Sequence, residues 1–377
     1  MEIESLLGHM VARKASDGFL SVGAEPCLKV DGELVTLDYG IMAETSVMAI
    51  IDSTLSDLQR EEFSRKHECN YAIDDAKYGR FRASAYVQRG MPSLVLRRIS
   101  ADIPSLPALG LPDIMERLAM LKRGLVLFVG GTGTGKSTSL ASMINYRNHN
   151  SRGHIVTIED PIEFVHSHQG CLISQREVGL DTESYEVALQ NTLRQAPDVI
   201  VIGEIRTAET MQAALSFAET GHLCIATLHA NNANQALDRI LSFFPGEKHN
   251  QIWMDLSLNL KATVAQQLLP QRDGKGRTPI VEVLVSTPLI QEHIRKGEVH
   301  LIKDLMHRSS ELGMQTFDQS LITAYKAGLI SGDVAIRHAD SANDVRLNIK
   351  LHAHGQGVFS DASNLNLEIA EDQFDER

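Results

Sequence analysis

The densest group of residues able to carry chemistry lies at positions 130–138, where the sequence reads GGTGTGKST. This run matches the pattern G-x-x-x-x-G-K-[ST], in which glycines let main-chain N–H groups surround phosphate oxygens. The start of the helix expected to follow adds partial positive charge. Lys136 would reach the β- and γ-phosphates of a nucleotide, and Ser137 would ligate Mg²⁺. The predicted phosphate site consists of Gly131, Thr132, Gly133, Thr134, Gly135, Lys136, Ser137 and Thr138.

A carboxylate ends the apolar segment DVIVIGE, at Glu204. A residue in this place lies at the carboxyl end of a strand, where ligands of α/β sheets bind. There Glu204 could orient a water molecule for attack on a γ-phosphate. The alternative is a strand-end glutamate that pairs with nearby Arg206.

Three more carboxylates follow the apolar run 155–158, at Glu159, Asp160 and Glu163. At the end of a neighbouring strand they could serve Mg²⁺ and water. The alternative is a polar turn fixed by Pro161, with acidic residues at a helix start.

Two histidines, His222 and His229, flank the run 223–227. Zinc binding is disfavoured because no other ligand pair accompanies them. They could act as polar sensors of phosphate or of the catalytic carboxylates, although a lone histidine is often structural. Arginines gather in the first hundred residues, where they could form ion pairs on a solvated face or reach a neighbouring subunit's γ-phosphate. They are Arg80, Arg82, Arg89, Arg97 and Arg98.

These residues need a sheet to position them, and four short apolar runs supply its strands. The runs are 125–129, 155–158, 199–202 and 223–227, with helix-like stretches between them. Buried parallel strands that alternate with helices indicate a doubly wound α/β domain.

The rest of the chain divides around this domain. Residues 1–100 predict a small α/β domain, with an amphipathic helix near the start, a helix over 46–58, and strands at 27–30, 81–87 and 94–99. Pro and Gly are dense in the expected linker, 101–112. Residues 113–347 would hold the larger domain and its carboxyl-terminal helices, with a capping-box start at Thr316 and Gln319. Residues 348–377 are acidic and predict a flexible tail.

Composition excludes several classes of protein. The 377 residues include 36 Lys and Arg against 48 Asp and Glu, a formal net charge of −12. Binding to DNA depends on basic residues that neutralise phosphates, so we expect no nucleic-acid partner. Four cysteines without C-x-x-C spacing suit free thiols in a reducing compartment. No apolar run reaches the ~18 residues of a membrane helix, and Glu2 and Glu4 argue against a signal peptide. We expect a cytoplasmic protein without a transmembrane segment.

The motifs GGTGTGKST, TIEDPIEF, VIGEIR and TGHLCIATLH, in this order and spacing, resemble those of the secretion-superfamily ATPases that drive type IV pili. Within that superfamily the chain is similar to the PilT/PilU family of retraction motors, including KASD near the start and GMQTFDQSL near the end. The absence of a four-cysteine metal motif favours retraction over extension relatives. The segments QNTLRQAPD and LHANNA and the acidic tail favour the PilU branch.

The resemblance implies a hexamer of subunits, each with a PAS-like first domain and a RecA-like second domain. ATP with Mg²⁺ would lie between the two domains of a subunit, and the neighbouring subunit would complete the site. Lys136 and Ser137 match the Walker A pair, and Glu204 matches the Walker B glutamate. Catalytic roles are further implied for an acidic box, a His box and two trans-acting arginines, namely Glu159, Asp160, Glu163, His222, His229, Arg82 and Arg97.

The function so implied is an ATP-hydrolysing motor that powers or assists pilus retraction in twitching motility, as a PilU-type accessory to a PilT-type ATPase. An inner-membrane platform protein would be a further partner, and would hold the chain peripherally at that membrane. The alternative is a regulatory subunit of the motor that is locked by nucleotide and has little turnover of its own. Relatives usually have Asp after GEIR, whereas this chain has Thr207, which leaves room for slow turnover.

Overall fold

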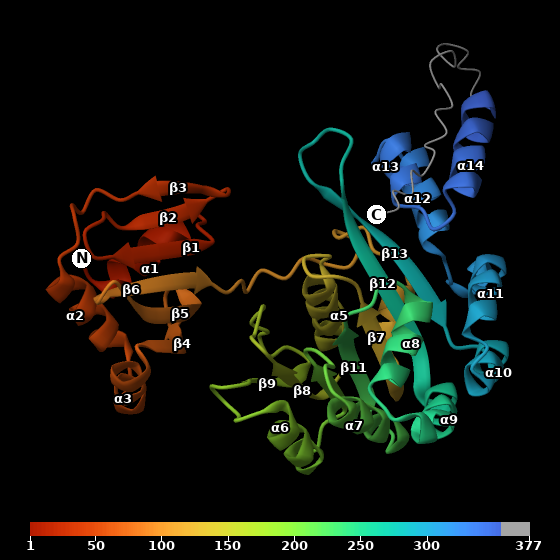
Figure 1. Cartoon of the computed structure of the whole chain (residues 1–377), viewed down its shortest axis with the longest axis horizontal. Helices are drawn as coiled ribbons and strands as arrows, with labels where there is room; N and C mark the ends of the chain where they lie inside the picture. Colours follow the sequence, from red (N-terminus) through yellow and green to blue (C-terminus); the bar gives the residue numbers. More distant parts are fainter. Residues whose placement is uncertain (356–377) are drawn as a thin grey trace, which may run out of the picture.

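The computed structural model describes residues 1–355, which form two β-sheets joined by an extended segment (Figure 1). The first sheet is antiparallel, with strand order β3-β2-β1-β6-β5-β4. Its strands are β1 (Asp17–Ser21), β2 (Cys27–Val30), β3 (Glu33–Thr36), β4 (Glu68–Asp75), β5 (Gly79–Gln88) and β6 (Met91–Arg98). The strands predicted at 27–30, 81–87 and 94–99 correspond to β2, β5 and β6.

Three helices accompany this sheet: α1 (Ile3–Ala12), α2 (Glu44–Thr54) and α3 (Asp57–Lys66). The amphipathic helix predicted near the start is confirmed as α1, which buries Leu6, Leu7 and Met10. The single helix predicted over 46–58 is wrong, because α2 ends at Thr54 and a second helix begins three residues later, at Asp57. Ser56 starts α3 through a reciprocal capping box with Gln59. A capping box is a local signal for the start of a new helix.

The segment between the sheets contains no helix or strand from residue 99 to residue 113. Its second half is nevertheless docked, because Leu106 and Leu111 are buried in the core of the larger sheet. The prolines and glycine prevent regular structure in this segment, yet part of the segment packs against the larger sheet and is more than a spacer.

The second sheet has the order β13-β12-β7-β11-β10-β8-β9. Every neighbouring pair is parallel except β12 and β13. The strands are β7 (Gly124–Val129), β8 (Gly153–Glu159), β9 (Cys171–Glu177), β10 (Val199–Ile202), β11 (Leu223–Leu228), β12 (Leu260–Pro270) and β13 (Arg277–Val285). The four predicted parallel strands are confirmed as β7, β8, β10 and β11, which are adjacent in the sheet.

Helices cover both faces of this sheet. Alternate residues of β7 point to opposite faces, so Leu125 and Leu127 join a core with α7 and α8, whereas Val126 and Phe128 pack with α4 and α5. The helices are α4 (Ile114–Ala119), α5 (Lys136–Asn150), α6 (Tyr185–Thr192), α7 (Ala208–Glu219), α8 (Ala233–Ser242) and α9 (His249–Asn259). Short 3₁₀ turns lie at Leu193–Gln195, Gly246–Lys248, Val299–Leu301 and Ser310–Leu312. The doubly wound α/β prediction is confirmed.

The carboxyl-terminal part is helical, as predicted. It comprises α10 (Pro288–Lys296), α11 (Ile302–Arg308), α12 (Phe317–Lys326), α13 (Gly332–Arg337) and α14 (Ala342–Gly355). The capping box of Thr316 and Gln319 is present at the start of α12. Helix α14 continues through Asn348, where the tail was expected to begin, to Gly355. The remaining tail residues, 356–377, lie outside the described residues. Within residues 1–355, no helix is both long and apolar enough to cross a membrane.

Candidate active site

The strand order places the predicted site residues at one edge of the larger sheet. Strands β7, β11, β10 and β8 are parallel neighbours, so the segments after them emerge side by side. These segments carry the phosphate loop, His229, Glu204 and the carboxylates 159–163 respectively. They line a cleft of about 640 Å³, which also receives Arg98 and Ser100 from the end of the first sheet and the connection.

The loop between β7 and α5 is bent by three glycines with positive φ: Gly130 at 154°, Gly133 at 76° and Gly135 at 88°. A Cβ atom at Gly130 would lie 2.6 Å from the main-chain oxygen of Gln266, and one at Gly135 would lie 2.8 Å from its Nε2 atom. Only glycine fits these places. The loop therefore has the tight curvature of a phosphate cradle, which leads directly into the first turn of α5.

Lys136 occupies the first position of α5 and folds back over the loop. Its Nζ atom donates to the main-chain oxygens of Gly130 at 2.9 Å and Gly131 at 2.7 Å. Burial lowers the pKa of Lys136, and the negative charge of Glu204 partly offsets this effect. The ammonium group is thus held by the loop, in a cleft that Glu204 also lines.

Glu204 lies just beyond β10 and is held by two cationic or polar partners. Its Oε2 atom accepts from Arg206 Nη2 at 2.7 Å, and its Oε1 atom lies 3.1 Å from His229 Nε2. Arg206 Nη1 is also 3.5 Å from Asp160 Oδ2. Both interpretations of Glu204 are therefore realised, since it pairs with Arg206 and also faces the cleft beside Lys136.

The three acidic-box residues line the same cleft but differ in their surroundings. Glu159 accepts from Thr157 Oγ1 at 2.7 Å and from Gln175 Nε2 at 3.1 Å. Burial raises its pKa, which these hydrogen bonds counteract. Asp160 faces Arg206, and Glu163 lines the cleft. The box thus combines a buried, hydrogen-bonded carboxyl group with acids that are open to a ligand.

The two histidines lie at opposite ends of β11, so the expectation that both act at the same site is not met within this chain. His229 follows the strand and reaches Glu204. His222 precedes the strand, where its Nδ1 atom lies 3.1 Å from Thr220 Oγ1 and 3.3 Å from the oxygen of Phe217. A six-residue strand separates its two ends by about 20 Å, so His222 does not line the cleft that His229 lines.

The predicted trans-acting arginines also lie outside the cleft of their own chain. Arg82 and Arg97 are directly opposite on β5 and β6. Arg97 Nε donates to Asp17 Oδ1 at 2.8 Å, and its side chain is 67% exposed. Arg80, by contrast, joins the two sheets of one chain, since it pairs with Asp74 at 2.8 Å and lies 3.8 Å from Glu177.

Several cleft residues were not predicted from the sequence. Tyr185 begins α6, and its hydroxyl would lie 2.9 Å from a Cβ atom at Gly203, which explains the glycine before Glu204. His166 is 8% exposed, and burial lowers its pKa to about 4, so the ring is neutral near pH 7. Leu268 and Arg277 come from the β12–β13 hairpin. Only Gly203 gave a local signal, because the other positions depend on long-range packing.

Thr207, which replaces the usual Asp after GEIR, is the N-cap of α7. Its side chain accepts from the main-chain N–H of Thr210 at 3.3 Å. Asp and Thr both serve as N-caps, so the exchange has a structural explanation that leaves Glu204 and Arg206 in place.

A parallel sheet with a phosphate loop after one strand and a half-buried glutamate after another defines a P-loop nucleoside triphosphatase. The family described as Type II/IV secretion system protein matches residues 66–331. Over 374 residues, which span 99% of this chain and 98% of the relative, the sequence is 57% identical to the type IV pilus ATPase PilU of Pseudomonas aeruginosa. It is 38% identical to the type IV pilus retraction ATPase PilT of the same organism, over 89% of this chain and 97% of PilT.

A solved structure of the pilus retraction motor PilT with bound ADP superimposes with a TM-score of 0.86 at 37% identity, over 92% of this chain and 99% of that one. The chain therefore belongs to the PilT/PilU family of type IV pilus retraction ATPases. The resemblance drawn from the four motifs is confirmed, as is the α/β fold class.

Proposed function

We propose that this chain is an ATP-hydrolysing subunit of a hexameric motor that powers or assists type IV pilus retraction, as a PilU-type accessory to a PilT-type ATPase. The observation that carries the proposal is the placement of Glu204 between Arg206 and His229, in the cleft that Lys136 also lines. Such an arrangement suits hydrolysis better than nucleotide binding alone, because a carboxylate held in one orientation can position the attacking water.

The phosphates of ATP would bind in the loop 131–138. Lys136 would exchange its two carbonyl partners for oxygens of the β- and γ-phosphates, and the first main-chain N–H groups of α5 would bind the α- and β-phosphates. Arg98 and Ser100, at the end of the first sheet, line the opposite wall of the cleft. This arrangement supports a nucleotide bound between the two parts of the chain.

The residues present fit Mg²⁺. The Ser137 hydroxyl lines the cleft together with the carboxylates Glu159, Asp160 and Glu163, and hard oxygen ligands are those that Mg²⁺ prefers. Ser137 would hold the ion directly, and the acidic box would hold its water ligands. The bound ion would neutralise charge on the phosphate oxygens.

Glu204 would accept a proton from water as the water oxygen attacks the γ-phosphorus and the bond to the ADP oxygen breaks. Arg206 and His229 would keep its two oxygens oriented, since each contacts a different one. Removing the γ-phosphate would release the contacts that Lys136 and His229 make around it. Movement of the first domain (1–100) against the second (113–347), about the linker 101–112, would then turn hydrolysis into a change of ring shape.

A neighbouring subunit would complete each site with Arg82 and Arg97, neither of which lines the cleft of its own chain. Besides the PilT-type ATPase, the motor would engage an inner-membrane pilus platform protein. The chain would thus act at the cytoplasmic face of that membrane, without a nucleic-acid partner.

The test is steady-state ATP hydrolysis by the purified chain, alone and with a PilT-type ATPase, compared with Glu204→Gln. We expect Mg²⁺-dependent hydrolysis that DNA does not stimulate. Glu204→Gln should lose about 100-fold or more in kcat, yet bind ATP with an affinity within about threefold of the parent. No hydrolysis by the parent in either mixture would reject the motor in favour of a nucleotide-locked regulator. Loss of ATP binding in Glu204→Gln would show that Glu204 is structural.

A further inference from the structure

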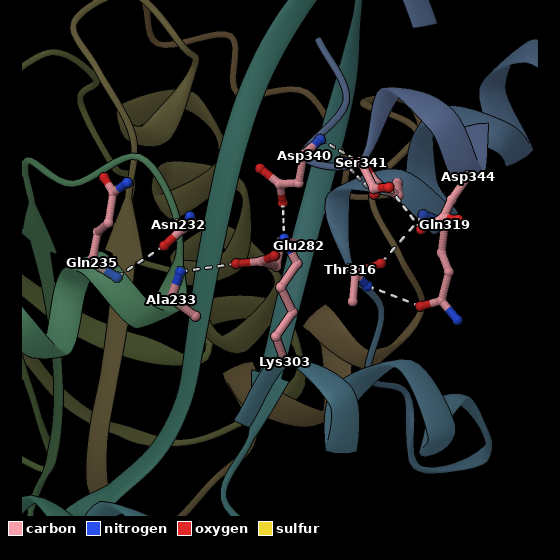
Figure 2. A network of polar contacts seen from close by, with 11 residues as sticks. Asn232, Ala233, Gln235, Glu282, Lys303, Thr316, Gln319, Asp340, Ser341 and Asp344 are labelled. Carbon is pink, nitrogen blue, oxygen red and sulfur yellow. Dashed lines mark hydrogen bonds and ion pairs between the residues drawn. The ribbon is translucent and has the colours of Figure 1, made fainter. Parts of the chain in front are cut away.

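A buried carboxylate outside the cleft lies where the segment after His229 meets the carboxyl-terminal helices. Glu282, in the middle of β13, is only 2% exposed. Its Oε1 atom accepts from the main-chain N–H of Ala233, the first residue of α8, at 2.8 Å (Figure 2). The first N–H groups of a helix have no partner inside the helix, so this bond fixes the start of α8 to the sheet.

The same carboxylate also faces the carboxyl-terminal helices. The main-chain amide of Phe317, the first residue of α12, contributes to lowering its pKa. Lys303 of α11 pairs with Asp340 beside it, as Figure 2 shows. Burial raises the pKa of Glu282 to about 7 despite these amides. A carboxyl group kept at such a cost in a sheet interior calls for a reason beyond packing.

The start of α8 follows closely in sequence on His229, a residue of the candidate active site. Only residues 230–232 separate Ala233 from His229, whose Nε2 atom contacts Glu204. Asn232 caps α8 by accepting from Gln235 N at 2.8 Å. A short connection between a fixed helix start and a strand end leaves the histidine little freedom, provided that the helix start stays fixed.

The β12–β13 hairpin connects this anchor to the phosphate loop. Ala265 is paired with Glu282 and Gln266 with Val281 across the two strands. Gln266 accepts from Ser139 Oγ of α5 at 2.7 Å, and its main chain closely approaches Gly130. Adjacent residue pairs of one hairpin thus contact the phosphate loop and the start of α8, and fix the two segments relative to each other.

We propose that Glu282 is a positioning residue for His229, which sets the histidine against Glu204 by anchoring the start of α8 to β13. The assignment rests on the proposed hydrolysis for its kinetic consequence, but not for its structural one.

The main test variant is Glu282→Met, which keeps the volume but removes both acceptor oxygens; Glu282→Gln restores one acceptor. Thr316→Ala is the matched control. Thr316 is equally buried and caps α12, so its loss destabilises the same region without touching α8. Hydrogen–deuterium exchange with a non-hydrolysable ATP analogue and Mg²⁺ reports on residues 229–233, with residues 130–138 as the internal reference.

In the parent and in Thr316→Ala, the analogue should protect both segments. In Glu282→Met, protection of 229–233 should be lost while that of 130–138 persists, and kcat should fall about tenfold or more with analogue affinity within about twofold. Glu282→Gln should recover most of both properties. If Glu282→Met does not fold, Glu282→Asp, which withdraws the carboxylate from Ala233, should give the same pattern.

Retained protection of 229–233 in the variant would overturn the assignment, as would an equal loss in Thr316→Ala. A parent that binds the analogue but hydrolyses no ATP, alone or with a PilT-type ATPase, would reject the proposed function only. The exchange pattern would still decide whether Glu282 positions the histidine segment.

Discussion

The carboxyl edge of the larger sheet and the paired strands β5 and β6 of the first sheet both carry charged residues predicted to act on one phosphate group. At the carboxyl edge, the charged groups satisfy one another within one chain: Glu204 is held by Arg206 and His229. On β5 and β6, Arg82 and Arg97 stand side by side, with Asp17 as the acid that Arg97 contacts.

This difference indicates that a single chain assembles the phosphate loop and the carboxylates of the site, but not its predicted arginines. Like charges side by side are unfavourable unless an anion lies nearby, and Arg97 remains largely exposed. We therefore expect the larger sheet to provide the phosphate cradle and the water-orienting carboxylate, and the first sheet to offer its arginines to a neighbouring subunit. In a closed ring each chain would play both parts.

The largest effect should follow from Lys136→Ala, which breaks the cradle itself. Removing the ammonium group takes away the charge aimed at the β- and γ-phosphates, so hydrolysis should fall by about 100-fold or more. Lys122→Ala is the matched control, because Lys122 is exposed just before the other end of β7. Steady-state ATPase rates measure both. Near-parental hydrolysis by Lys136→Ala would show that the phosphates bind elsewhere.

The phosphate cradle was predictable because each strand that supports it can be recognised from a short stretch of sequence. Four continuous apolar runs indicated β7, β8, β10 and β11, and parallel packing then brought their carboxyl ends together. Strands β12 and β13 gave no such signal, since Gln266 and Glu282 interrupt their apolar character. The hydrogen bond between Gln266 and Ser139 joins residues 127 positions apart, and no local pattern reports such a contact. The histidines were correctly predicted to flank a strand, and the role of His222, which was implied by the resemblance, stays a prediction.

A smaller but more specific effect is expected from the arginine half of the site. Arg97→Ala should lower hydrolysis by about tenfold or more, because a neighbour's γ-phosphate loses a cation. Mixing Arg97→Ala with Lys136→Ala in equal amounts should leave about one quarter of the interfaces intact in random rings. Partial activity should return in the mixture. Arg89→Ala, in the exposed β5–β6 turn, is the control that should remain near parental activity.

Co-assembled mixtures no more active than their separate components would contradict completion by a neighbour. Arg97 would then be a surface residue held by Asp17, and the contrast between the two sheets would lose its functional meaning.

The smallest effect is expected at His222. It tests whether residues that affect hydrolysis lie only at the carboxyl edge of the larger sheet. His229→Ala should lower kcat about tenfold or more, because Glu204 loses the partner of one carboxylate oxygen. His222→Ala should change kcat by less than about threefold, since the His222 side chain hydrogen-bonds to Thr220 and Phe217 at the far end of β11. The two variants remove the same side chain from the same strand, so steady-state kinetics separates position from residue type. Equal losses of kcat in folded rings would mean that the amino edge also reaches a phosphate, through a neighbouring subunit, and that the cleft of one chain is not the whole of the histidine's environment.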